Sequence, residues 1–166
     1  MFVKGDKVVY PRHGVAVVEG LVELETFGER RTYVRLRPVN GNLMITVPVD
    51  NVEQVGVREV ACREDAEAVF DLLRLDEGEL PTLWSQRYKT NLTKLVSGDI
   101  HQGAEVVRDL SLREKRVGIS SAERQMLAKA RQILISELSC TFDSTEESAQ
   151  TMLDGVLQGS GSTDSA

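Results

Sequence analysis

The chain has 166 residues, of which 41% are hydrophobic and 28% charged, and its formal net charge is −6. This composition is typical of an ordered globular protein and excludes a disordered or fibrous one. The length suits one ordinary domain or two small ones. The acidic balance argues against a protein held on nucleic acid by charge alone, because Lys and Arg supply most non-specific affinity for phosphate.

The charges are unevenly distributed along the chain. Residues 1–60 hold eight basic and eight acidic side chains, and residues 61–80 hold two against seven. Residues 81–140 hold ten basic against six acidic, whereas residues 141–166 hold none against five. One basic segment therefore lies between two acidic ones, and we expect any contact with DNA to fall within residues 81–140.

The sequence gives little sign of export, membrane insertion or disulfide bonding. Charged residues interrupt the first seven positions, where a signal peptide needs an apolar stretch, and no apolar run approaches membrane-spanning length. The two cysteines, Cys62 and Cys140, form no Cys-x-x-Cys motif. We expect a cytoplasmic, monomeric protein without a disulfide framework, a zinc site or a membrane partner.

Residues 1–60 are predicted to form a β module. Runs rich in β-branched residues are separated by turn residues every eight to twelve positions, and the expected strands cover residues 6–10, 15–22, 31–37 and 43–49. Gly28 marks an interruption before the third run, the sequence Asn40-Gly41-Asn42 indicates a hairpin, and Pro48 indicates an edge or a bulge. We expect a small SH3-like barrel of four or five strands, since closure removes exposed edges.

From about residue 64 the apolar period becomes that of helices, which predicts an all-α module over residues 61–158 and an α+β fold of two modules. About five helices are expected, with apolar positions within residues 66–73, 84–95, 100–110, 126–138 and 149–156. The first should stop near Gly78 and Pro81. The expected N-terminal caps are Asp99, Ser120 with Glu123, and Ser144 with Glu147. Residues 159–166 are small and polar, and we expect a disordered tail.

Catalytic chemistry has little support in the sequence. His13 falls in a predicted turn, and His101 has Glu105 four residues later on a predicted helix. No glycine-rich phosphate loop lies between a strand and a helix. We therefore expect neither an enzyme nor a cofactor or metal, although a metal protein or enzyme built on His101 and Glu105 is one alternative.

Several separated segments resemble one known family. These segments are residues 5–15, 47–48, 55–58, 84–89, 97–99, 104–110 and 126–131. Over residues 1–157 the chain resembles the CarD/CdnL family of bacterial transcription regulators. The resemblance implies that the β module is a Tudor-like domain that binds a lobe of the RNA polymerase β subunit. It also implies that the helical module contacts promoter DNA without reading its sequence and stabilises the open complex.

The resemblance assigns the central role to Trp84, which matches a tryptophan that acts as a wedge at the upstream edge of the transcription bubble. Periodicity alone would place Trp84 in the core, but it follows Pro81 in a first helical turn, where a side chain can project outward. Basic residues near it are suited to phosphate contacts that position the protein, and these are Arg87, Lys89, Lys94 and Arg124.

The resemblance also assigns a polymerase-binding edge, where strand addition is the expected mode. Its residues are Tyr33, Val34, Arg35, Met44, Ile45, Thr46 and Pro48. Leu24, Thr46 and Gln86 depart from residues found in some relatives. Because Gln86 replaces a basic residue and the chain is acidic, a polymerase-binding adaptor that does not engage DNA is the other alternative.

Overall fold

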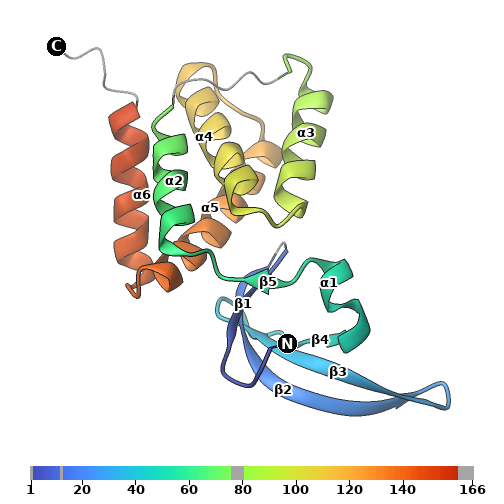
Figure 1. The fold of residues 1–166 in the computed structure, drawn as a ribbon. Helices are drawn as coiled ribbons and strands as arrows, with labels where there is room; N and C mark the ends of the chain where they lie inside the picture. The colour runs from blue at the N-terminus through green and yellow to red at the C-terminus, as the bar shows by residue number, and fades with distance from the viewer. Residues whose placement is uncertain (1, 12, 76–80, 161–166) are drawn as a thin grey trace.

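The structure, a computed structural model, describes residues 2–11, 13–75 and 81–160. A five-stranded antiparallel sheet is followed by a bundle of helices, and the two parts lie one above the other in Figure 1. The predicted two-module α+β fold is confirmed. Gly78, where the first long helix was expected to stop, lies outside the described residues.

The sheet has the strand order β4-β3-β2-β1-β5. Its strands are β1 (Lys7–Tyr10), β2 (Gly14–Thr26), β3 (Glu29–Pro38), β4 (Ile45–Pro48) and β5 (Arg58–Glu59). The hairpin of β2 and β3 extends away from the helices (Figure 1). The hairpin is longer than the sequence predicted. Its outer pairs, from Glu23 with Thr32 to Thr26 with Glu29, are exposed and mostly polar, so the sequence does not mark them as strand. Backbone pairing continues there without an apolar pattern to reveal it.

The turn of this hairpin consists of Phe27 and Gly28, which have φ angles of 53° and 80°. Two successive positive φ angles define a type I′ turn, whose twist suits a two-residue hairpin loop. Glycine adopts this conformation without steric cost. The interruption predicted at Gly28 is therefore a tight turn within one hairpin.

Side chains from a short 3-10 helix, η1 (Val49–Asn51), and from α1 (Val52–Val55) complete the core of the β module. The sheet contributes Val8, Ala16, Val18, Val34, Leu36 and Val47. Val49, Val52 and Val55 pack against this cluster. A sheet with so few strands is therefore covered by the segment that follows β4.

The helical module contains α2 (Arg63–Leu73), α3 (Trp84–Val96), α4 (Ile100–Arg116), α5 (Ser121–Thr141) and α6 (Glu146–Ser160). The Asp99 carboxylate accepts a hydrogen bond from the Gln102 backbone N–H at 3.1 Å, as the sequence predicted. The capping box of Ser120 and Glu123 is also present.

The predicted cap at the start of α6 is wrong. The Thr145 hydroxyl, not that of Ser144, accepts a hydrogen bond from the Ser148 backbone N–H at 3.0 Å. Both residues are good N-cap types, so composition alone does not distinguish them. α6 also runs two residues beyond the predicted module boundary, and the rest of the predicted tail, residues 161–166, lies outside the described residues.

α3 differs from the other helices of the bundle in how it is held. Apolar side chains of α2, α4, α5 and α6 form one continuous core. In α3 only Arg87 and Asn91 are buried, while Tyr88 and Leu95 are half-buried. The helix that carries Trp84 is therefore attached to the bundle largely through polar side chains.

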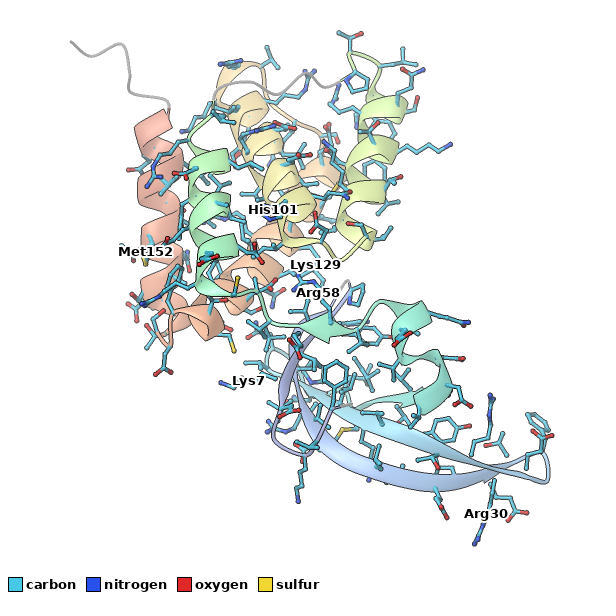
Figure 2. All side chains as sticks on the ribbon, in the orientation of Figure 1. Lys7, Arg30, Arg58, His101, Lys129 and Met152 are labelled. Atoms are coloured by element: carbon cyan, nitrogen blue, oxygen red, sulfur yellow. The ribbon has the colours of Figure 1, made fainter. Side chains whose placement is uncertain are left out.

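The two modules are joined by contacts between distant parts of the chain. The Arg58 guanidinium donates to both carboxylate oxygens of Glu137, at 2.6 and 2.7 Å, and its Nε donates to the Gly98 carbonyl at 2.7 Å. Figure 2 shows Arg58 at this junction. Pro11 is buried at this junction and packs against Gly98. A Cβ atom added to Gly98, whose φ is 77°, would lie 3.0 Å from the ring of Pro11. The orientation of the modules, which the sequence left open, is thereby defined.

Within the part of the chain that the structure describes, no helix is both long enough and apolar enough to span a membrane.

Candidate functional site

Trp84 is the first residue of α3, and 45% of it is exposed. Its indole N–H donates a hydrogen bond of 2.8 Å to the hydroxyl of Ser120, which caps α5. The indole ring stacks on Tyr88, one turn later, with ring centroids 5.3 Å apart and planes 21° apart. The ring is therefore exposed, as its position in a first turn predicted, but it is anchored at its polar atom and along one face.

The Ser120 hydroxyl uses its full hydrogen-bonding capacity. It accepts from the Trp84 indole and from the Glu123 backbone N–H, the latter at 3.2 Å. It donates to the Glu123 carboxylate at 3.1 Å, which also accepts from the Ser120 backbone N–H at 3.2 Å. A hydroxyl offers one donor and two acceptor sites. The capping box thus holds the tryptophan as well as the start of α5.

Arg87 lies inside the bundle, which corrects the expectation that it contacts DNA phosphate. It is 4% exposed, and its Nε and Nη2 donate to the two carboxylate oxygens of Glu123 at 2.6 and 3.1 Å. Its Nη1 donates to the carbonyls of Pro81 and Thr82. A guanidinium is buried at low cost only when its donors are matched in this way. Arg87 supports the segment that presents Trp84 instead of meeting a ligand.

The pKa values of this pair reflect the same contacts. Hydrogen bonds from Arg87 lower the pKa of the Glu123 carboxyl from its ordinary value of 4.5 to about 2, against the opposing effect of burial. Hydrogen bonds from Ser120 lower it further, and the same ion pair raises the pKa of Arg87. Glu123 is therefore ionised at neutral pH although it is buried.

The remaining basic candidates are placed differently from one another. Lys89 is exposed and has no ion pair among the described residues. Lys94 is half-buried and bonds to Glu105 at 2.8 Å. Arg124 is exposed on the first turn of α5, and its Nε lies 3.5 Å from Glu114. Lys89 can thus reach a phosphate directly, whereas Lys94 would first have to leave Glu105 and Arg124 would first have to leave Glu114.

The ion pair with Lys94 also engages Glu105, one of the two residues of the alternative metal site. No hydrogen bond or ion pair of the His101 side chain occurs among the described residues, and Glu105 is paired with Lys94. The described residues contain no cluster of three His, Cys, Asp or Glu side chains suited to a metal ion.

The polymerase-binding candidates divide between the two faces of the sheet. By the register of β3 with β4, Tyr33 is opposite Pro48 and Arg35 is opposite Thr46. Alternation along a strand places these four side chains on one face, and Thr46 and Arg35 are exposed.

Val34 does not fit a side-chain contact with a partner, because it is 5% exposed and packs in the core of the β module. Ile45 lies on the same inner face and is half-buried, while Met44 precedes β4 and is 42% exposed. β3 is also an interior strand, so of these two strands only β4 lies at an edge of the sheet. The expected edge is therefore four residues of β4, and β3 contributes side chains from its outer face.

Sequence reasoning missed two residues of the tryptophan site. Ser120 and Glu123 were recognised as a capping box, but nothing in their spacing shows that the box bonds to a residue 36 positions earlier. The available signal was an acidic residue, Glu123, within a basic segment. A buried carboxylate requires a cationic partner, so this residue indicated an ion pair inside the helical module.

Comparisons with known proteins match both modules of the chain. A family model described as the CarD-like/TRCF RID domain matches residues 2–61, and one described as the CarD C-terminal domain matches residues 68–154. The putative transcription factor YdeB of Bacillus subtilis (strain 168) is 33% identical over 147 residues, which cover 89% of this chain and 96% of that protein. A solved structure, CdnLNt from Myxococcus xanthus, shares 38% identity and covers 36% of this chain and 84% of that chain, with a TM-score of 0.32.

The first family matches the antiparallel sheet and the second matches the helical module that follows it. Together with the relative from Bacillus subtilis, these matches define the class of protein as a transcription factor. The chain belongs to the CarD/CdnL family. Membership of the CarD/TRCF RID family implies an interaction with RNA polymerase.

Proposed function

We propose that this protein binds the β subunit of RNA polymerase through its β module and stabilises the promoter open complex by placing Trp84 at the upstream edge of the bubble. The observation that carries the proposal is the position of Trp84. The indole is 45% exposed at the start of α3 while its N–H and one face are held by Ser120 and Tyr88. A rigid, exposed, planar side chain is suited to replace the neighbour that a base loses when DNA melts.

The energy available from such a contact is large enough to matter. Stacking of a base on an aromatic side chain contributes roughly 1–3 kcal/mol. Since about 1.4 kcal/mol corresponds to a factor of ten, one indole can shift the balance between closed and open DNA by on the order of tenfold. It does so only if it binds the open form better than the closed form.

The same geometry supports a contact that does not read sequence. The indole N–H is the ring's single polar group, and Ser120 already accepts its hydrogen bond. The ring can therefore offer a base its apolar surface but no hydrogen bond. Lys89 and Arg124 would add phosphate contacts, which position a protein without specifying bases.

Polymerase binding would supply the affinity that the DNA contacts lack. β4 is an edge strand, and an edge strand can pair with a strand of a partner. On one face of the sheet, Tyr33 and Arg35 of β3 lie beside Pro48 and Thr46 of β4. Once the β module is docked, the helical module has a high effective concentration at the promoter. The contacts between the modules, centred on Arg58, would transmit the position of one module to the other.

The first experiment measures the lifetime of open complexes after a competitor challenge, with and without the protein. Trp84→Ala is expected to shorten the lifetime by about tenfold while co-purification with polymerase is unchanged. Trp84→Phe retains a planar ring and should lose less. Met152→Ala is the matched control, because Met152 is 42% exposed on α6, at a distance from α3 in the bundle (Figures 1 and 2). An unaltered lifetime with Trp84→Ala would remove the wedge from the mechanism.

A second experiment tests the polymerase contact. Arg35→Glu reverses an exposed charge beside β4 and is expected to abolish co-purification with polymerase. Arg74→Glu makes the same charge change at the C-terminal cap of α2, where 57% of the Arg74 side chain is exposed, and should leave binding intact. Retention of binding by Arg35→Glu would place the polymerase contact elsewhere on the protein.

One observation favours the alternative of a polymerase-binding adaptor without a DNA contact. Of the four basic candidates, Arg87 is buried and Lys94 is paired, and the chain carries a net charge of −6. Protection of upstream promoter DNA that requires both polymerase and this protein, and that weakens with salt, would exclude the adaptor.

A further inference from the structure

We propose that Ser120, through its buried partner Glu123, is a positioning residue that fixes the orientation of the Trp84 ring. This inference extends the proposed function, because it concerns the same indole. It assigns a role to a residue that touches neither DNA nor polymerase in that proposal. Its physical basis is the hydrogen bond of 2.8 Å between the indole Nε1 and the Ser120 hydroxyl, which joins α3 to the start of α5.

The ring would be mobile without that bond. Tyr88 restrains it along one face, but stacking alone permits sliding and rotation in plane. The helix does not fix the orientation of the ring by itself, since Trp84 is the first residue of α3 and its side chain lies at the end of the helix. The hydrogen bond to Ser120 fixes the polar edge of the ring relative to the bundle. Two attachment points of different kind then define one orientation.

Ser120 is itself held firmly. Its hydroxyl donates to a carboxylate that is 1% exposed and also accepts the Glu123 backbone N–H. That carboxylate also accepts from the guanidinium of Arg87, which is 4% exposed and donates to the carbonyls of Pro81 and Thr82 just before α3. The chain entering α3 and the ring at its first residue are thus tied to the same buried carboxylate. A displacement of one would displace the other.

Pre-organisation of this kind favours binding, because a side chain that is already ordered loses less entropy when it meets its partner. The effect applies to whichever ligand the indole stacks on. Loss of the hydroxyl should therefore make the ring more mobile first, and weaken the function of the ring as a consequence.

The test uses the fluorescence of Trp84, which is the only tryptophan in the chain and so reports the ring alone. Three full-length variants are compared with the parent. Ser120→Ala removes the hydroxyl, Ser120→Thr retains it, and Thr145→Ala removes the hydroxyl that caps α6. The last is the matched control for the loss of a helix cap, which lowers stability by itself, and α6 lies on the far side of the bundle from α3 (Figure 1).

In the free protein, Ser120→Ala is expected to add a fast component to the decay of fluorescence anisotropy and to increase quenching by acrylamide. Ser120→Thr should restore the parent's behaviour, and Thr145→Ala should leave it unchanged. Unfolding curves measured by circular dichroism establish that all variants are folded at the temperature of the assay. Unchanged anisotropy in folded Ser120→Ala, or equal changes in Thr145→Ala, would overturn the assignment.

With polymerase and promoter DNA, Ser120→Ala is expected to shorten the open-complex lifetime by about two- to tenfold, the range expected when one side chain must be ordered on binding. The two proposals fail separately. If Trp84→Ala has no effect on lifetime, the wedge is wrong, yet the anisotropy still decides whether Ser120 positions the ring. If Trp84→Ala shortens the lifetime and Ser120→Ala does not, the wedge stands and the positioning role is refuted.

Discussion

Arg58 and Glu137 connect the two modules through a bidentate ion pair, in which two guanidinium nitrogens donate to two carboxylate oxygens at 2.6 and 2.7 Å. Arg58 lies in β5 at the end of the β module, and Glu137 lies 79 residues later in α5. Glu137 is almost fully buried and also accepts the Ala61 backbone N–H at 2.8 Å. A carboxylate with this environment needs its cationic partner, because the charge cannot be solvated.

The first prediction concerns this junction. Arg58→Ala is expected to lower the free energy of unfolding by about 3–5 kcal/mol, as is usual when one partner of a buried ion pair is removed. Arg58→Lys should lose part of this, since an ammonium cannot bond in the bidentate manner. Denaturant unfolding measures both effects. Arg37→Ala breaks a largely exposed pair with Glu19 and serves as the control, with an expected loss below about 1 kcal/mol.

The same variant should loosen the orientation of the modules. Residual dipolar couplings measured on the parent are expected to fit one alignment tensor for both modules, whereas those of Arg58→Ala should require two. A single tensor for the variant would mean that the remaining contacts between the modules, such as those of Pro11 with Gly98 and of Asn40 with Glu146, suffice to hold the junction.

A second prediction concerns the phosphate contacts. In the presence of polymerase, Lys89→Gln is expected to weaken protection of upstream promoter DNA and to reduce the magnitude of its logarithmic salt slope by about 1, as for the loss of one phosphate contact. Lys94→Gln should have a smaller effect, because Lys94 is already paired with Glu105. Equal effects of the two variants would show that Lys94 leaves Glu105 when DNA is bound.

A third prediction follows from the pKa of Glu123, which Arg87 lowers to about 2 from the ordinary value of 4.5. A carboxyl whose pKa is lower in the folded state stabilises the fold above its unfolded pKa, and this contribution is lost as the pH falls from about 4.5 to about 2. The difference is on the order of 3 kcal/mol. The raised pKa of Arg87 acts only at high pH and does not affect this window.

The measurement is the free energy of unfolding in urea at a series of pH values from about 7 down to about 2. Glu123→Gln should reduce stability at neutral pH, because it leaves Arg87 without a charged partner, and should flatten the decline in acid. Glu114→Gln removes an exposed carboxylate and should preserve the decline. A decline that persists unchanged in Glu123→Gln would assign the acid sensitivity to other groups.

The two-module fold was predictable because its signals are local. The change from β-branched runs to a helical period near residue 64, and caps such as Asp99, depend on neighbours within a few positions. The exposed position of Trp84 was inferred from Pro81 and from the family resemblance, not from periodicity, which favoured burial. The structure lies between the exposed ring and the buried ring that these two lines of reasoning favoured, since the indole is 45% exposed and stacked on Tyr88.

The features that sequence reasoning missed all depend on partners far away in the chain. Arg87 looked like a surface charge because its partner, Glu123, is 36 residues later. Val34 looked like part of an edge because strand order cannot be read from strand positions. A buried ion pair and an interior strand are properties of the assembled fold, so one sequence without its contacts does not reveal them.

The last prediction concerns Asn91, which lies one turn after Arg87 on the inner face of α3. It is fully buried, and neither its amide nitrogen nor its amide oxygen has a hydrogen-bond partner among the described residues. A buried amide without partners costs about 1–3 kcal/mol. Asn91→Leu is therefore expected to raise the free energy of unfolding by about that amount. Thr93→Leu, exposed on the same helix, controls for helix propensity and should change it by less than about 0.5 kcal/mol.

The consequence for function distinguishes two reasons for an asparagine at this position. If α3 needs only to be held, Asn91→Leu will be more stable and will support open complexes as long-lived as those of the parent. If the polar attachment of α3 lets the helix adjust when Trp84 meets DNA, the stabilised variant will shorten the lifetime, because activity that needs movement is lost as rigidity increases. Destabilisation by Asn91→Leu would contradict both, and would indicate that the amide is hydrogen-bonded in solution.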